Sequence, residues 1–211
     1  QKTTHARMDI VDIPGLCQGG AAEFAGPLQD ADALVLIVRG FVNEAVGMAE
    51  VPRPVADMQD VLTELIISDL SIVERRLDRL AKNAKAAKAL PGEQEALIKA
   101  QQALENEQPV SSQEYTAEEK SALRNYGLYT EKPMLAVLNT SEEGLSADQA
   151  PGQTELAAYT RDRHMPLLIV CAPLEEEISQ LPVEDRTAFL EDLGVAESGV
   201  ARLARAAYVH L

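Results

Sequence analysis

Four short, largely apolar runs constrain the fold of this chain more than any other feature. Runs of this length that are rich in Val, Ile and Leu are typical of strands buried on both faces of a parallel sheet. Each run ends in small or polar residues, and open α/β sheets bind ligands in the loops at the carboxyl ends of their strands. The sequence therefore predicts an α/β fold with a mostly parallel sheet. The four predicted strands are residues 8–12, 33–38, 134–138 and 167–171.

A long helical pattern separates the second run from the third. From residue 58 to residue 90, Leu, Ile and Val recur every three or four positions, which predicts a helix of about 33 residues and about 50 Å. Pro91 and Gly92 then interrupt the pattern, and residues 93–107 resume it. Two helices around so short a break predict an antiparallel α-helical hairpin, or coiled coil, inserted into the sheet domain.

Helix signals also follow the hairpin. Thr116 with Glu119 three residues later has the spacing of a capping box, which predicts the start of a short helix. Towards the carboxyl end, residues 183–193 and 198–211 predict two helices that cover the sheet, and Gly194 is placed to close the first.

The balance of charges limits the partners of this chain. With 19 Lys and Arg against 34 Asp and Glu, the formal net charge is −15. Gripping nucleic acid over a whole surface needs basic side chains against the phosphates, so the composition argues against that mode but leaves room for a local basic patch. No apolar run approaches the ~20 residues of a membrane span, and the first residues lack a signal-peptide pattern. We therefore expect a cytoplasmic protein with no membrane partner.

The loop after the first run has the form Asp-x-x-Gly. In P-loop NTPases, an Asp at such a strand end serves Mg²⁺, and the Gly three residues later offers its backbone N–H to the γ-phosphate. Asp12 and Gly15 hold these positions. The motif alone is a weak signal, because an Asp also starts many ordinary turns.

The loop after the third run is Asn139-Thr140-Ser141-Glu142. GTPases place Asn-Lys-x-Asp at this position, where the Asp carboxylate accepts two hydrogen bonds from guanine. Here the acidic residue is Glu142, one methylene longer, and Thr140 replaces the Lys. A turn or a helix cap would explain this loop equally well if it stood alone. Together with Asp12 and Gly15, in the right order on successive strands, it favours a nucleotide site.

These loops and several longer segments resemble the YchF family of Obg-like ATPases. The resemblance rests on MDIVDIPGL, ALVLIVRGF, TELIISDLSIVERRLDRL, the Asn-Thr-Ser-Glu loop and FLEDLGVAESGVARLARAAY, which together extend over nearly the whole chain. It implies a P-loop NTPase with a helical coiled-coil insertion and a carboxyl-terminal TGS domain, which prefers ATP to GTP.

The resemblance also implies roles for individual residues. Asp12 would hold Mg²⁺, through a water molecule, and Gly15 would contact the γ-phosphate. Asn139 and Glu142 would lie at the adenine. The backbone of Cys171 and Ala172 would form the last nucleotide-binding loop, against the base.

This sequence departs from the family pattern in several places. It contains no G-x-x-x-x-G-K-[ST] motif, so the cradle for the α- and β-phosphates and its lysine are missing, and no TGS domain follows. We therefore expect a sheet that is incomplete at its amino-terminal side. Leu16, in contrast, agrees with the family, in which a hydrophobic residue after this Gly is normal; because Ras-like enzymes have here the Gln that orients the attacking water, no catalytic base is identified.

A basic stretch lies in the predicted hairpin. Residues 74–88 carry six basic side chains against two acidic ones, and Arg75, Arg79 and Lys82 share one helical face. A contact with RNA or a ribosome would use such a face, in line with the resemblance. A solvated helix surface is the simpler alternative, because no aromatic residues alternate with the basic ones to stack on bases.

Three hypotheses follow for the function. The first is an ATPase in its intact form, of which these residues alone would bind nucleotide weakly and turn over little. The second is a non-hydrolysing module that binds RNA or protein on a degenerate NTPase scaffold, and the third is a purely structural helical hairpin. The first assigns residues 1–53 to the switch part of the NTPase core, 54–130 to the insertion and 131–211 to the base-recognition part.

Overall fold

The computed structural model describes residues 8–13, 25–48, 50–82, 90–147, 149–192, 194–195 and 197–210. The chain divides into two compact units. We call Gln1–Asp32 with Val61–Lys132 the helical unit, and Ala33–Asp60 with Pro133–Leu211 the sheet unit. The three-part division expected from the sequence stays a prediction.

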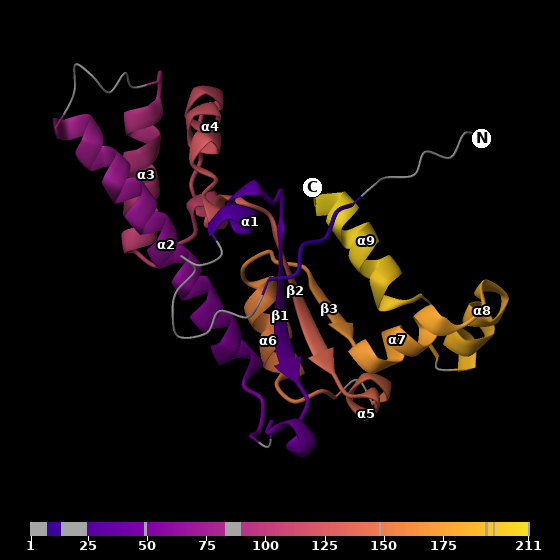
Figure 1. Cartoon of the computed structure of the whole chain (residues 1–211). Helices are drawn as coiled ribbons and strands as arrows, with labels where there is room; N and C mark the ends of the chain where they lie inside the picture. The colour runs from indigo at the N-terminus through magenta and orange to yellow at the C-terminus, as the bar shows by residue number, and fades with distance from the viewer. Residues whose placement is uncertain are drawn as a thin grey trace, which may run out of the picture. The chain divides into compact units, whose positions relative to one another are not determined.

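The sheet unit is built on three parallel strands in the order β1-β2-β3 (Figure 1). Three of the four predicted strands are thereby confirmed. The pairing places Gly40 at the end of β1 beside Thr140 at the end of β2, so the loops that follow lie at one edge of the sheet. The strands are β1 (Leu34–Gly40), β2 (Met134–Thr140) and β3 (Leu167–Val170).

Burial differs between the three strands, and among the described strands β2 alone has a strand neighbour on each side. Most side chains of β2 are buried, and Ala136 and Leu138 are fully covered. In β1, Val35 and Ile37 remain 42% and 66% exposed. The expectation that every strand is buried on both faces is therefore wrong for β1.

The predicted strand at residues 8–12 is also wrong. Residues 8–13 adopt no regular secondary structure. Met8, Ile10 and Val11 are 43%, 71% and 64% exposed. An apolar run becomes a strand only when neighbouring strands take up its backbone hydrogen bonds and cover its side chains. Among the described residues, no strand pairs with this segment.

In the helical unit, α3 (Glu93–Glu105) packs against α2 (Pro54–Lys82), as Figure 1 shows. Residues 61–82 of α2 belong to this unit. The helix begins at Pro54, four residues before the predicted start. Proline suits the first helical position because it lacks a backbone N–H, and an N–H at this position would have no partner within the helix. Gly92 adopts φ 71° directly before α3, in the left-handed region that favours glycine, so the predicted break is confirmed. The buried core between the two helices includes Val73, Leu80, Ala96, Leu97, Ala100 and Leu104.

Short elements complete the helical unit. The capping box predicted at Thr116 is confirmed: its hydroxyl accepts from the Glu119 N–H, and the Glu119 carboxylate accepts from the Thr116 N–H. These elements are α1 (Ala25–Asp30), η3 (Val110–Ser112), α4 (Ala117–Leu123), η4 (Arg124–Tyr126) and η5 (Tyr129–Glu131).

Five α-helices and one short 3-10 helix belong to the described part of the sheet unit. The two predicted helices near the carboxyl end are confirmed as α8 and α9, and Gly194, with φ 69°, donates its N–H to Glu191 O just after α8. None of the helices in the described part of the chain is long and apolar enough to cross a membrane. The elements are η2 (Glu44–Val46), α5 (Glu142–Ser146), α6 (Gln153–Arg161), α7 (Ala172–Gln180), α8 (Val183–Asp192) and α9 (Gly199–His210).

Candidate functional site

The loops after β2 and β3 are joined by a side chain. The Asn139 side-chain oxygen Oδ1 accepts a hydrogen bond of 3.0 Å from the backbone N–H of Ala172. Asn139 lies near the end of β2, and Ala172 is the first residue of α7, directly after Cys171. Four of the predicted site residues (Asn139, Glu142, Cys171 and Ala172) therefore lie on two loops that this contact brings together. We call these two segments, residues 139–142 and 171–172, the base loops.

Thr140 and Ser141 have structural roles within the first base loop. Thr140 is buried, and its hydroxyl donates to the Gly40 carbonyl of β1 at 3.3 Å. A Cβ on Gly144 would lie 2.3 Å from this hydroxyl oxygen, so the fold requires glycine there. The Ser141 hydroxyl caps α5 by accepting from the Gly144 N–H. The helix-cap interpretation of this loop thus holds for Ser141.

Glu142 is free to meet a ligand. It is exposed in the first turn of α5, and its carboxylate has no partner within the described part of the chain. Cys171 differs, because its side chain is 3% exposed and packs with Leu174 and Ile178. Cys171 can therefore offer a ligand its backbone alone.

The roles predicted for the switch residues stay predictions. Gly15 lies outside the described residues. Asp12 is exposed and belongs to the helical unit, whereas the base loops belong to the sheet unit. Within the described ranges, no group of three or more His, Cys, Asp or Glu side chains could hold a metal ion.

Arg39 organises a third loop at the same edge of the sheet. It pairs with Asn139 in the β1–β2 register. Its guanidinium Nη1 donates to the backbone carbonyls of Phe41 at 2.8 Å and Glu50 at 3.2 Å, which folds residues 41–50 back on themselves. Sequence reasoning did not single out Arg39, although a lone Arg that ends an apolar run and precedes Gly40 is a signal that could have found it.

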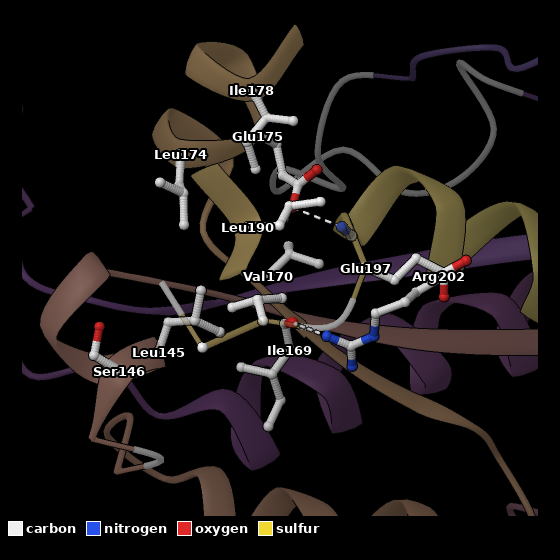
Figure 2. A pocket seen from close by; sticks show the side chains of 13 residues that line it. Leu145, Ser146, Ile169, Val170, Leu174, Glu175, Ile178, Leu190, Glu197 and Arg202 are labelled. Atoms are coloured by element: carbon white, nitrogen blue, oxygen red, sulfur yellow. Dashed lines mark hydrogen bonds between the residues drawn. The ribbon is translucent and has the colours of Figure 1, made fainter. Parts of the chain in front are cut away.

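A pocket of about 150 Å³ lies behind the base loops, between β3, α5, α7, α8 and α9 (Figure 2). Its lining is both apolar and polar, with Leu145 of α5 and Leu174 of α7 among the apolar residues. Glu175, Glu197 and Arg202 are the charged members of its lining. Sequence reasoning missed all three, because their partners lie far along the chain or on other elements.

The basic stripe predicted on the hairpin is exposed on α2. Arg75, Arg79 and Lys82 are exposed, although Lys82 lies 3.4 Å from the carboxylate of Asp78. Their neighbour Arg76 instead faces the core, where its Nε lies 2.7 Å from the Glu93 carboxylate. Residues 83–89, which carry the rest of the basic stretch, lie outside the described ranges.

Glu93 shows how the hairpin accommodates a buried charge. Its side chain is 1% exposed and accepts hydrogen bonds from Arg76, the Tyr126 hydroxyl and the Leu90 backbone N–H. Burial alone would raise the pKa of Glu93, but these hydrogen bonds together outweigh it and hold the pKa below its ordinary value. The ionised form is therefore the one that the fold stabilises.

Known proteins match this chain in sequence and in fold. The Ribosome-binding ATPase YchF of Bacillus subtilis (strain 168) is 32% identical over 218 residues, which cover 99% of this chain and 59% of that protein. The protein of the same name from Escherichia coli O157:H7 is 32% identical over 217 residues, with the same two coverages. The chain thus spans about three fifths of the curated relatives it matches. No protein-family model matches it.

A solved structure supports the fold. The YchF GTPase of Schizosaccharomyces pombe superposes with a TM-score of 0.80 at 22% identity, over 95% of this chain and 55% of that one. This likeness confirms the predicted α/β fold of the P-loop NTPase type. The YchF relatives at 32% identity match nearly the whole of this chain, including the segments that carry the base loops. The chain belongs to the YchF family.

Proposed function

We propose that the full-length protein that carries this chain binds ATP at the base loops, hydrolyses it with Mg²⁺ and prefers it to GTP. The hydrogen bond between Asn139 Oδ1 and the Ala172 N–H carries the proposal, because it joins the two loops that would enclose the base. The relatives at 32% identity are named ATPases, which supports hydrolysis.

The exposed carboxylate of Glu142 supports the choice of base. A carboxylate can accept one hydrogen bond from the exocyclic amino group of adenine, whereas guanine offers two donors, which the shorter Asp of GTPases accepts; the preference for ATP is therefore ascribed to the added methylene of Glu142. Thr140 is turned inward to Gly40, so the choice of base falls to Asn139 and Glu142. Cys171 and Ala172 would lie against the base through their backbone. Gly15, outside the described residues, is proposed to contact the γ-phosphate.

Asp12 fits a role at Mg²⁺. Magnesium at nucleotide sites keeps several waters and takes one or two carboxylates together with phosphate oxygens, so no preformed protein cage is needed. The exposed Asp12 carboxylate can supply one such contact, directly or through water. When bound, the ion would neutralise the charge that develops on the phosphates.

The exposed basic residues Arg75, Arg79 and Lys82, which we call the α2 stripe, support a ribosomal partner in the cytoplasm. The relatives are named ribosome-binding, and Arg75, Arg79 and Lys82 offer exposed positive charge to RNA phosphates. The same stripe favours a second candidate, a module that binds RNA or protein without hydrolysing nucleotide. The two candidates differ in whether ATP is consumed at all, which a single-turnover assay with labelled ATP would decide.

Base choice is tested by calorimetric titration of the full-length protein with ATP and with GTP. We expect ATP to bind more tightly. Shortening Glu142→Asp should weaken ATP binding about tenfold, the scale of one charge-assisted hydrogen bond. Glu143→Asp is the matched control, since Glu143 is exposed one residue later in α5, and it should leave the affinity unchanged. Tighter binding of GTP by the wild type would refute the role of Glu142.

A further inference from the structure

The amino-terminal end of α9 is held by a side chain from another helix. The Glu175 carboxylate of α7 accepts from the Gly199 N–H at 2.6 Å (Figure 2). It also accepts from the Val200 N–H at 3.3 Å. The first N–H groups of a helix have no partner within the helix and carry partial positive charge, so an anionic acceptor there is strongly favoured. The Ser198 hydroxyl accepts from the next N–H, that of Ala201.

Gly199 has no side chain, which leaves room for this contact. A Cβ at this position would lie 2.8 Å from the Glu175 carboxylate oxygen Oε1 and 2.8 Å from Val170 Cγ1. A larger residue would require the Glu175 carboxylate, the Val170 side chain or the first turn of α9 to move. Glycine therefore permits the contact between Glu175 and the α9 backbone in this arrangement.

A second side chain fixes α9 to the sheet. β3 is an edge strand in the described sheet, and the carbonyl of Ile169 accepts a hydrogen bond of 3.4 Å from Arg202 Nη1 of α9. Edge strands leave backbone groups without a strand partner, so a covering helix needs donors of this kind. Glu175 and Arg202 thus attach α9 to α7 and to β3.

The two helices that begin at the base loops, α5 and α7, line the same pocket as α9. α5 begins at Glu142 and contributes Leu145 and Ser146 to the lining, and α7 contributes Leu174 and Glu175. Glu175 lies three residues after Ala172, about 4.5 Å along the axis of α7. Because so short a helical segment moves as one body, a shift at the Ala172 N–H displaces the Glu175 carboxylate with it.

We propose that Glu175 is a positioning residue that couples occupancy of the base loops to the docking of α9. The coupling rests on the proposed nucleotide function of those loops. A base that contacts the loops restrains Ala172, and with it α7, in the position from which Glu175 caps α9. Linkage then requires a reciprocal effect: ATP affinity must be lower when α9 is undocked, by the same factor by which ATP favours the docking of α9.

The test is hydrogen exchange of α9 in the full-length protein, with and without ATP, alongside ATP titration. In the wild type, we expect ATP to slow exchange in the first turn of α9. Glu175→Gln should speed that exchange about tenfold, as expected for the loss of a charged cap, remove the effect of ATP and weaken ATP binding several-fold. Glu177→Gln is the matched control, because Glu177 is exposed on the same helix, and it should behave as the wild type.

A second variant approaches the contact from α9. Gly199→Ala should reproduce the fast exchange of Glu175→Gln, because the added methyl group collides with Glu175 and Val170. Without that close contact, Ala would stabilise the helix relative to Gly and slow the exchange, so the sign of the change separates the two explanations.

Three results would overturn the inference in distinguishable ways. Wild-type exchange in both Glu175→Gln and Gly199→Ala would show that the contact does not hold α9. ATP binding without any change in α9 exchange would refute the coupling and leave the proposed function standing. No ATP binding by the wild type would refute the proposed function, and the coupling with it, whatever the exchange of α9.

Discussion

Asp69 is a buried carboxylate on α2 whose replacement by Ala should destabilise the helical unit by about 3 kcal/mol. Its side chain is fully buried and accepts three hydrogen bonds: from the Tyr129 N–H at 2.8 Å, the Thr130 N–H at 2.8 Å and the Thr130 hydroxyl at 2.7 Å. Each buried donor left without a partner costs about 1–3 kcal/mol. Three donors at the lower end of that range give about 3 kcal/mol, since removing a buried charge offsets part of the loss.

Urea unfolding followed by far-UV circular dichroism would measure the change, with hydrogen exchange at Tyr129 and Thr130 as a local readout. Both amides should exchange faster in Asp69→Ala. Asp69→Asn keeps one acceptor oxygen and should cost about 1–2 kcal/mol. Asp78→Ala is the matched control, because Asp78 is exposed on the same helix and should change stability by less than about 0.5 kcal/mol.

A loss below about 1 kcal/mol in Asp69→Ala, with unchanged exchange at both amides, would refute this reasoning. It would mean that the segment before β2 holds its conformation without the carboxylate. A fall in the control Asp78→Ala equal to that in Asp69→Ala would point instead to the net charge of α2.

Two further predictions concern charge in the helical unit. Since the pKa of Glu93 is lowered in the fold, its contribution to stability is present above its unfolded pKa of about 4.3 and is lost as pH falls through the folded value. The difference in unfolding free energy between wild type and Glu93→Gln, measured by urea unfolding, should therefore be constant near neutral pH and shrink below pH ~4.3. A difference that grows on acidification would contradict this sign. Changing Arg75, Arg79 and Lys82 to Ala together should weaken ribosome binding in a sedimentation assay and lower the salt dependence by up to about three units of slope, whereas unaltered binding and slope would leave the stripe as a solvated surface.

The apolar runs predicted the three strands of the described sheet, and β2 is the one whose sequence agrees best with its surroundings. Residues 134–138 are apolar throughout and form most of β2, which has strand neighbours on both sides. Residues 8–12 contain Met8, Ile10 and Val11 but also two Asp residues, and strand formation depends in addition on neighbours that no local pattern encodes. The same dependence explains Ile37, which has the sequence of a buried strand residue and is 66% exposed.

The candidate site divides in the same way. Asn139, Glu142 and Ala172 could be found from the sequence because each lies in a loop that follows a predicted strand. Glu175 and Asp69 could not, since Gly199 lies 24 residues from Glu175 and Tyr129 lies 60 residues from Asp69. From sequence alone, an acidic residue on a helix is expected to be solvent-exposed. Only the tertiary structure shows that backbone N–H groups distant in sequence donate to it.

The central claim is that ATP binds against the base loops. The most direct test is NMR titration of the ¹⁵N-labelled chain with ATP, a method that detects weak binding. We predict the largest chemical-shift changes at the Ala172 amide and the Asn139 side-chain amide, with smaller ones at the α5 amides after Glu142. Saturable binding with no change at Asn139 or Ala172, or shifts confined to the α2 stripe, would contradict the account.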